Sequence, residues 1–263
     1  MAPFASYLFD LRSDRVIDVV GDHFHGWLIS RASAVPGLAE RLHAPSRGKP
    51  FSLGFGRHRH GIWLRVASID AELSELLARS SPTSVPIGPV ELHCVGLWRP
   101  GEHAWARKTS GEQLWESVMH LNLVPEVQRL VFVSPTAFAS DRRAQTVAPT
   151  ARLVFKSLIK TWNENASPRI GDDLAFELLE SLHEGPSVIR VVPEVRFRSY
   201  RSRGFVGWCD YSCASGASDQ VRRVLHLLVQ FAFFAGVGQR RTMGMGMTLP
   251  SDMLAFQNGV PID

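Results

Sequence analysis

The chain has 263 residues, 45% of them hydrophobic, and a formal net charge of +4, a length that can bury one large core or two modest ones. Three cysteines without a CxxC pair argue against a disulfide framework and a cysteine zinc site, and favour a cytoplasmic protein with reduced thiols. No apolar run reaches the roughly 18 residues of a membrane span, so we expect no membrane partner.

The first part of the chain alternates between strand-like and helix-like hydrophobic patterns. The expected elements, in chain order, are a strand at 6–11, a helix at 24–42 that restarts near Pro36, strands at 51–56 and 61–69, a helix at 70–78 and a strand at 90–98. Their order is βαββαβ. A polar, glycine-bearing segment at 100–111 is the expected linker.

The second part repeats this order. The expected elements are a strand at 129–134, a helix at 153–163, strands at 189–200 and 204–211, a helix at 218–234 and a strand at 244–249. A ferredoxin-like βαββαβ unit fits both halves. We therefore predict an α+β protein of two tandem ferredoxin-like (RRM-like) domains, at 1–110 and 111–263.

A glycine-rich segment at 235–247 follows the long apolar helix of the second half. Its backbone amides lack shielding side chains, which suits a loop that cradles phosphates, and its arginines add charge. The alternative is a plain corner between helix and strand. The residues concerned are Gly236, Gly238, Arg240, Arg241, Gly244 and Gly246.

Five short segments, taken together, resemble a known family. They are Leu42-His43 with Lys49-Pro50-Phe51-Ser52, Ser134 to Phe138, Phe155 to Leu158 with Trp162-Asn163, Gly204 to Trp208, and the glycine-rich loop. Their order and spacing resemble the CRISPR-associated repeat-RNA-processing endoribonucleases, the sixth Cas family of the RAMP superfamily. The resemblance implies tandem ferredoxin-like folds and CRISPR repeat RNA as partner.

The resemblance also implies a reaction. Members cleave CRISPR precursor RNA within each repeat without a metal or cofactor: the 2′-hydroxyl attacks the adjacent phosphate and leaves 2′,3′-cyclic phosphate and 5′-hydroxyl ends. The ten histidines show no HExxH or comparable ligand spacing, which also predicts no metal site. Such chemistry needs a proton acceptor, a proton donor and stabilisation of negative charge at phosphorus.

Carrying the family's motif over gives His43 as general acid or base and Lys49 as transition-state stabiliser. The family commonly adds a tyrosine on the first helix, but this chain has no tyrosine between Tyr7 and Tyr200. His25 is the expected substitute, because an imidazole also donates or accepts protons near neutral pH. The competing interpretation is that His25 packs against a neighbour or caps its helix. Arg41 and Ser46 are further alternatives for the third role.

Several arginines are expected to contact the RNA backbone, since arginine suits phosphate contact. Arg57 and Arg59 stand in a polar hairpin turn, and Arg196 and Arg198 share one face of an arginine-rich strand. With the glycine-rich loop they form the predicted RNA surface. Tryptophans are expected mainly in the core.

Two other functions stay open from the sequence. One is a non-catalytic RNA-holding RAMP subunit of a CRISPR effector complex, which would add effector subunits as partners. The other is a general ferredoxin-like RNA-binding or small-molecule domain. The sequence leaves the recognised repeat, its hairpin requirement, the acid or base role of His43 and a homodimeric state undecided.

Overall fold

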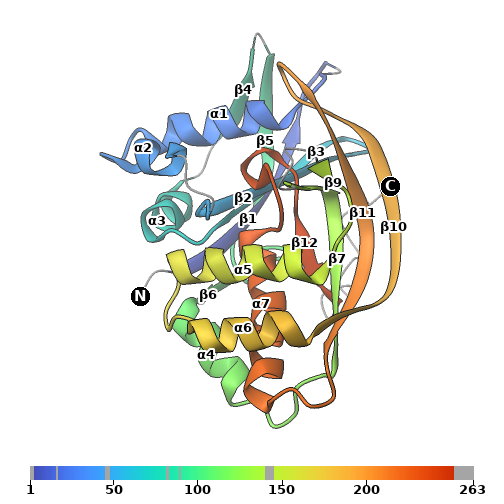
Figure 1. Cartoon of the computed structure of the whole chain (residues 1–263). Coiled ribbons are helices and arrows are strands. Elements are labelled where there is room, and N and C mark those ends of the chain that lie inside the picture. Colours follow the sequence, from blue (N-terminus) through green and yellow to red (C-terminus); the bar gives the residue numbers. More distant parts are fainter. Residues whose placement is uncertain are drawn as a thin grey trace.

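The computed structural model of the chain describes residues 3–15, 17–44, 48–80, 83–88, 90–139 and 145–251. The elements of the first half are β1 (Pro3–Arg12), α1 (Gly21–Ala32), α2 (Leu38–His43), β2 (Phe51–His58), β3 (Gly61–Ser68), α3 (Ala71–Arg79), β4 (Ser84–Ile87), β5 (Val90–Trp98) and β6 (Lys108–Ser110). They build an antiparallel sheet of order β2-β3-β1-β5-β4, with β6 also paired to β1 (Figure 1). Without the short edge strand β4, this is the strand order of a ferredoxin-like unit.

The second half follows the same plan. Its elements are α4 (Gly111–Met119), β7 (Val127–Thr136), β8 (Phe138–Ala139), β9 (Gln145–Thr146), α5 (Ala151–Asn165), α6 (Asp172–Ser181), β10 (Leu182–Arg196), β11 (Arg201–Cys213), α7 (Asp219–Ala235), the 3₁₀ turn η1 (Arg241–Met243) and β12 (Thr248–Pro250). The second sheet is antiparallel, in the order β10-β11-β7-β12. The predicted α+β fold with ferredoxin-like halves is confirmed.

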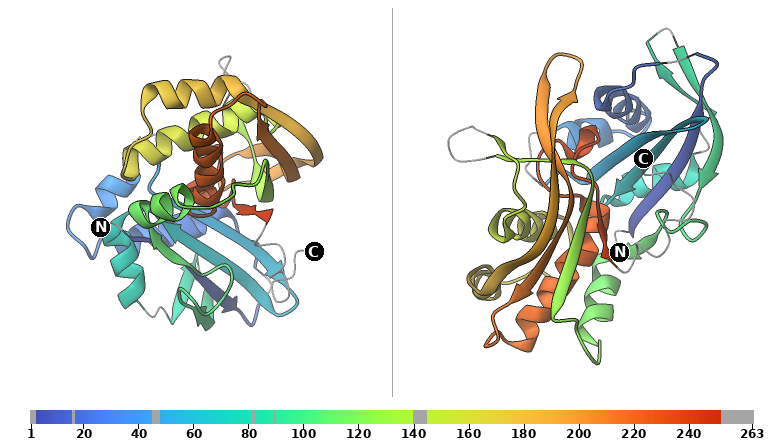
Figure 2. Two further views of the ribbon diagram at one scale, coloured as in Figure 1. Left: turned by 90° about the horizontal axis from the view of Figure 1, so that it is seen from below. Right: turned by 90° about the vertical axis from the view of Figure 1, so that its right-hand side faces the viewer.

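Helix α7 lies between the two sheets (Figures 1 and 2). It contacts β7, β11 and β12 of the second sheet as well as β1, β2 and β3 of the first. Its buried side chains extend from Val221 to Ala235, and in the last stretch, 231–235, every residue is buried, as expected for a helix end enclosed on every side. The elements that follow α7, η1 and β12, therefore lie at the junction of the two halves.

The cores of the two halves merge at this junction. Phe4 of β1 packs its ring against Trp162, Phe231 and Phe234 of the second half, with ring centroids 6.4, 5.6 and 5.9 Å apart. Arg65 of β3 is 1% exposed and donates to the carbonyl of Phe233 at 2.9 Å. The halves are thus joined by buried apolar and polar contacts.

The segment predicted as the linker, 100–111, contains a buried side chain and a short strand. Trp105 is 1% exposed, and Lys108–Ser110 forms β6, which pairs with the first residues of β1. The Ser110 hydroxyl accepts from the backbone N–H of Gln113 and so begins α4, which packs on α7. We propose the domain boundary here, between residues 110 and 111.

The hairpin of β10 and β11 extends along one side of the molecule (Figure 1). Register shifts interrupt the pairing between Glu184 and Ser187 and again between Val192 and Val195, and each interruption contains a proline, Pro186 or Pro193. The tip of the hairpin meets the start of α1. Within the described residues, no helix is both long and apolar enough to cross a membrane.

Candidate active site

His25 and His43 lie side by side on the first half. Their ring centroids are 5.5 Å apart and the rings are nearly perpendicular, at 84°. His25, in the second turn of α1, is half-buried and stacks on Phe51 with a centroid distance of 5.8 Å. His43 is exposed at the last residue of α2. One ring is therefore held by packing while the other faces solvent.

The orientation of His25 is set by a backbone carbonyl of the second half. Its Nδ1 lies 3.1 Å from the carbonyl oxygen of Thr242 in η1. A carbonyl oxygen only accepts, so Nδ1 carries the proton and Nε2 of the neutral ring keeps its lone pair. Burial lowers the pKa of His25 below its ordinary value of 6.5, against the raising effect of the Thr242 hydrogen bond. The ring is therefore suited to accept a proton at Nε2.

Lys49 folds back onto the end of α2. Its ammonium donates to the carbonyls of Leu42 at 3.3 Å and His43 at 3.2 Å, and also to that of Ala44. These three acceptors match the three N–H bonds of a lysine. Burial lowers the pKa of Lys49. Lys49 thus fixes the C-terminal end of α2, which carries His43, and places a positive charge beside that histidine.

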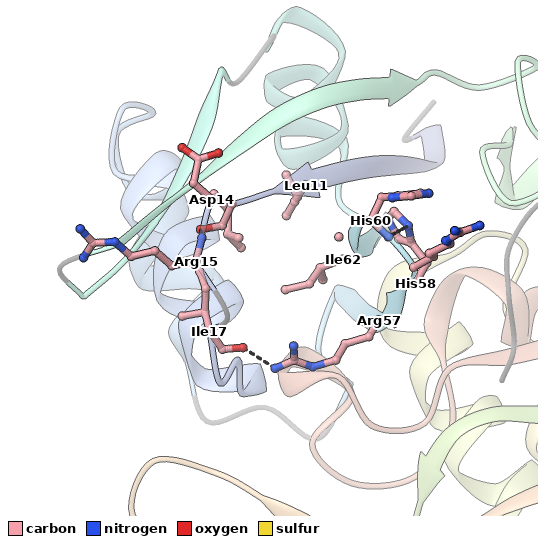
Figure 3. Close-up of a pocket in the computed structure, with 12 residues that line it drawn as sticks. Leu11, Asp14, Arg15, Ile17, Arg57, His58, His60 and Ile62 are labelled. Carbon is pink, nitrogen blue, oxygen red and sulfur yellow. Dashed lines mark hydrogen bonds between the residues drawn. The ribbon is translucent and has the colours of Figure 1, made fainter.

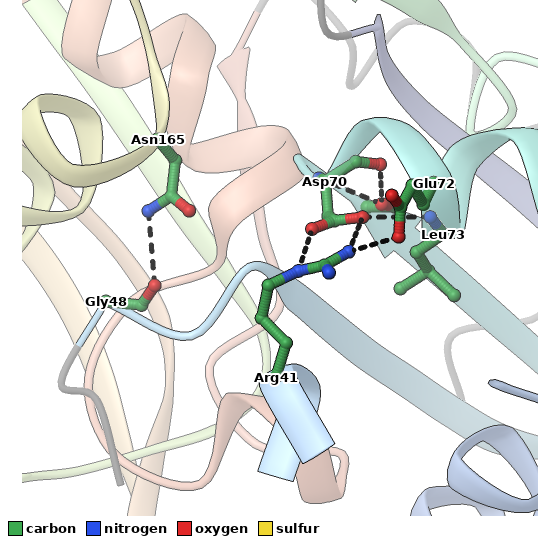
Figure 4. Close-up of polar contacts among 7 residues, drawn as sticks. Arg41, Gly48, Asp70, Glu72, Leu73 and Asn165 are labelled. Carbon is green, nitrogen blue, oxygen red and sulfur yellow. Dashed lines mark hydrogen bonds and ion pairs between the residues drawn. The ribbon is translucent and has the colours of Figure 1, made fainter. Parts of the chain in front are cut away.

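Gly48, directly before Lys49, is held by the second half (Figure 4). The amide of Asn165, at the end of α5, donates to the carbonyl of Gly48 at 3.2 Å. A Cβ atom on Gly48 would lie 1.8 Å from a carboxylate oxygen of Glu164, so a larger residue here would have to displace that side chain. Both sides of the candidate site therefore depend on the second half.

Arg41 is not available for the third catalytic role that the sequence allowed. Its guanidinium is paired with Asp70 at 3.2 Å and with Glu72 at 2.7 Å, as Figure 4 shows. These carboxylates raise its pKa further above the ordinary value. Ser46, the other alternative, lies outside the described residues.

The glycine-rich loop is largely packed, which favours the alternative of a corner between helix and strand over an open phosphate cradle. The amide of Gly236 donates to Ala232, that of Val237 to the carbonyl of Gly246, and that of Gly246 to Pro135, at 2.8, 2.8 and 3.0 Å. A Cβ on Gly244 would lie 2.3 Å from the Phe55 ring. All four glycines, Gly236, Gly238, Gly244 and Gly246, have positive φ. Their positive φ favours glycine, and at Gly244 the absence of a side chain also permits close packing against the first half.

Arg241 caps a helix, which corrects its predicted position on the RNA surface. It is 4% exposed and donates to the carbonyls of Ala235 at 2.6 Å and Gly236 at 3.4 Å. The last carbonyls of a helix have no partner within the helix and attract positive charge. Burial lowers the pKa of Arg241 to about 10, which leaves it charged at neutral pH.

Arg240, Arg196 and Arg198 gather beside α1. The Nε of Arg240 donates to the Tyr200 hydroxyl at 2.8 Å, and its guanidinium lies 4.6 Å from the centre of that ring. At the hairpin tip, Arg196 pairs with Asp18 at 2.8 Å, and the amide of Arg198 donates to Asp22 at 3.2 Å. Arg196 and Arg198 are exposed. The tip thus places cationic side chains near the helix that carries His25.

Arg57 and Arg59 lie elsewhere, at the far end of β2. They border a hollow of about 290 Å³ that also contains His58 and His60 (Figure 3). Arg57 donates to the carbonyl of Ile17, and His58 pairs with Asp10 at 3.0 Å. At about 3.3 Å of rise per residue, the turn is roughly 20 Å from the start of β2, which His25 contacts. The structure therefore separates this pair of arginines from the histidines.

Comparison with known proteins adds a family signature to this geometry. Residues 130–248 match the family model of the CRISPR-associated endoribonuclease Cas6. A product complex of Thermus thermophilus Cas6 (TTHB231) is 25% identical, covers 95% of this chain and 100% of its own, and has a TM-score of 0.83. The chain is Cas6-like. The resemblance predicted from the sequence is confirmed.

Two further structures extend the Cas6-like fold. A product complex of a second Cas6 (TTHA0078) is 23% identical, with a TM-score of 0.81 and coverage of 95% of this chain and 99% of its own. A Cas6-related protein from Pyrococcus furiosus is 14% identical, with a TM-score of 0.56 and coverage of 94% and 98%. At these identities the likeness concerns the fold. No curated protein matches the chain.

Proposed function

We propose that this chain is a metal-independent endoribonuclease that cleaves CRISPR precursor RNA within its repeats. The observation that carries the proposal is the pairing of His25 with His43, 5.5 Å apart, beside the charge of Lys49. It is supported by the likeness to Cas6 structures described as product and substrate mimic complexes.

The arrangement suits an internal transfer at phosphorus. Nε2 of His25 accepts the proton of the 2′-hydroxyl while the 2′-oxygen bonds to the adjacent phosphorus. The bond from phosphorus to the 5′-oxygen breaks, and His43 donates a proton to that oxygen. Lys49 stabilises the negative charge that develops on the phosphoryl oxygens. It does so through its positive charge, or by redirecting one of its N–H bonds from a backbone carbonyl to a phosphoryl oxygen. The products are a 2′,3′-cyclic phosphate and a 5′-hydroxyl.

The RNA duplex is proposed to lie along the hairpin tip and α1. Arg196 and Arg198 are exposed there, and Arg240 is half-buried against Tyr200. A protein holding A-form RNA contacts mainly phosphates and 2′-hydroxyls, which suits flexible cations on a projecting hairpin. Arg57 and Arg59 would contact only an RNA long enough to reach the far end of β2.

The test is cleavage of an end-labelled repeat RNA in EDTA, comparing wild type with His43→Ala. Removing a group that transfers a proton is expected to slow cleavage about 10²- to 10⁴-fold and leave RNA affinity nearly unchanged. His183→Ala, an exposed histidine at the start of β10, is the matched control and should cleave normally.

The outcomes separate the candidate functions. Cyclic phosphate ends that are lost in His43→Ala establish the proposed enzyme. Normal cleavage by His43→Ala removes His43 from the mechanism. Tight binding without cleavage by the wild type identifies an RNA-holding RAMP subunit instead, and the absence of both binding and cleavage contradicts an RNA function.

A further inference from the structure

The contact between His25 and η1 joins the candidate catalytic site to the glycine-rich loop. The hydrogen bond from His25 to the Thr242 carbonyl crosses from the first half of the chain to the second. In a neutral histidine one ring nitrogen carries the proton and the other has a free lone pair. Because the Thr242 carbonyl accepts the proton of Nδ1, it leaves Nε2 free and so determines which ring atom faces the RNA.

The turn that presents the carbonyl is fixed at both ends. Arg240 before it and Gly244 after it have left-handed backbone conformations, with φ of 54° and 88°. Arg241, inside the turn, is anchored through its guanidinium to the end of α7. Since α7 is enclosed by both sheets, the turn is attached to the most buried helix of the molecule.

The turn also rests directly on the first residue of α1. A Cβ atom built on Gly21 would lie 1.7 Å from the carbonyl oxygen of Met243. Real Cβ atoms do not approach a carbonyl oxygen so closely, so only glycine at position 21 permits this contact between η1 and α1. His25 lies one helical turn further along the same helix. The distance from η1 to His25 is therefore set by backbone contact at Gly21.

We propose that the glycine-rich loop is the positioning element of the general base: Gly21 and Arg241 seat η1 so that the Thr242 carbonyl holds His25 with Nε2 toward the 2′-hydroxyl. This inference rests on the proposed function. The loop acts through backbone geometry and does not itself touch the phosphate. Gly21 and Arg241 are positioning residues, because both act through His25.

The first test reads the tautomer of His25 without RNA or catalysis. Nitrogen-15 NMR of histidine-labelled protein, with His25→Gln used to assign the signal, reports which ring nitrogen carries the proton. The other charged groups that face His25 are His43, Lys49 and Asp22, so the spectrum is recorded above the pH at which the histidines titrate. A neutral ring protonated at Nδ1 is expected. A ring protonated at Nε2 in the wild type overturns the proposal.

The second test compares two glycines of the same helix. Gly21→Ala must displace η1, whereas Gly26→Ala meets nothing within 4 Å and serves as the matched control. In single-turnover cleavage, Gly21→Ala is expected to lose about 100-fold in rate, the size of loss that a misplacement of about 1 Å can cause, with RNA affinity within about twofold. Its His25 signal should become a mixture of tautomers. Gly26→Ala should match wild type in both.

The two proposals fail differently. If the wild type does not cleave RNA, the proposed function fails, while the tautomer measurement still decides whether the loop orients His25. If the wild type cleaves and Gly21→Ala cleaves equally fast, the positioning role is wrong and the enzyme stands. If Gly21→Ala does not fold, the wild-type tautomer remains the deciding result.

Discussion

At the scale of single residues, the two histidines differ in how each ring is held. His25 is half-buried against Phe51 and tied to a carbonyl, whereas His43 is exposed at the end of α2. A fixed, partly desolvated imidazole suits the base, which must be neutral to accept a proton. An exposed imidazole suits the acid, which must regain a proton from solvent after each reaction. These environments support the proposed division, with His25 as the base and His43 as the acid.

This division predicts the pH dependence of cleavage. A base works in its deprotonated form, so the rate rises with pH through the pKa of His25. Because burial lowers that pKa from its ordinary value of 6.5, the midpoint of the rising limb is expected below pH 6.5. Single-turnover rates measured between about pH 5 and 8 check this. A midpoint above 6.5 would contradict His25 as the base.

The site was predictable in part from the residues alone. The resemblance implies roles for His43 and Lys49, and it makes His25 the substitute for the tyrosine that the family commonly has on the first helix. The structure brings the three side chains together, and their catalytic roles are proposals. The role of the Thr242 carbonyl was not predictable, since a backbone oxygen leaves no signal in side-chain chemistry. The prediction for Arg241 was wrong because the sequence does not distinguish two adjacent arginines. In the structure, Arg241 caps the end of α7, whereas Arg240 contacts Tyr200.

At the scale of elements, the end of α7 explains several buried polar side chains. Its final carbonyls receive hydrogen bonds from Thr248 at Ala232, Arg65 at Phe233, Ser52 at Phe234 and Arg241 at Ala235. These donors replace the water that an exposed helix end would bind. Two buried arginines also complement the negative end of the helix dipole.

Arg65→Met should test this capping. Arg65 donates to the carbonyls of Trp105 at 3.0 Å and Phe233 at 2.9 Å, and the Trp105 carbonyl also accepts from the Ser6 hydroxyl at 3.0 Å. Loss of Arg65 therefore removes the side-chain donor of the buried Phe233 carbonyl, at about 1–3 kcal/mol. Urea unfolding measures the change in the free energy of unfolding. The control is Arg79→Met, whose exposed ion pair with Glu75 contributes about 0.3–0.5 kcal/mol. Equal effects for both variants would exclude a capping role.

The regular elements were predicted where the hydrophobic period is long. Strands β2, β3, β5 and β11 and helices α3, α5 and α7 match their predicted ranges closely, and the break near Pro36 separates α1 from α2. The strand predicted at 189–200 is β10, which runs from Leu182 to Arg196, and helices α4 and α6 were not predicted. Short pieces such as β4 and β6 were missed, because three or four residues do not establish a period. β12 begins later than predicted, since Gly244 and Gly246 adopt positive φ before it.

At the scale of the whole molecule, the shared core implies that the halves unfold together. Phe4, Trp63 and Trp105 from the first half belong to the same buried cluster as α5 and α7. We expect one cooperative transition in urea. Hydrogen exchange with mass spectrometry should show amides of β3 and β7 losing protection at the same urea concentration. Earlier loss in β3 would show that the first half unfolds independently.

The hairpin of β10 and β11 also carries an exposed strand edge. β10 is the outermost strand of its sheet and exposes Val188 and Val191, the kind of edge to which a strand from another copy adds. Pro186 and Pro193 lack an N–H and coincide with the two register shifts, so the regular edge is confined to the short stretch between them. The protein can thus extend a long arginine-bearing arm without offering a template for fibre growth.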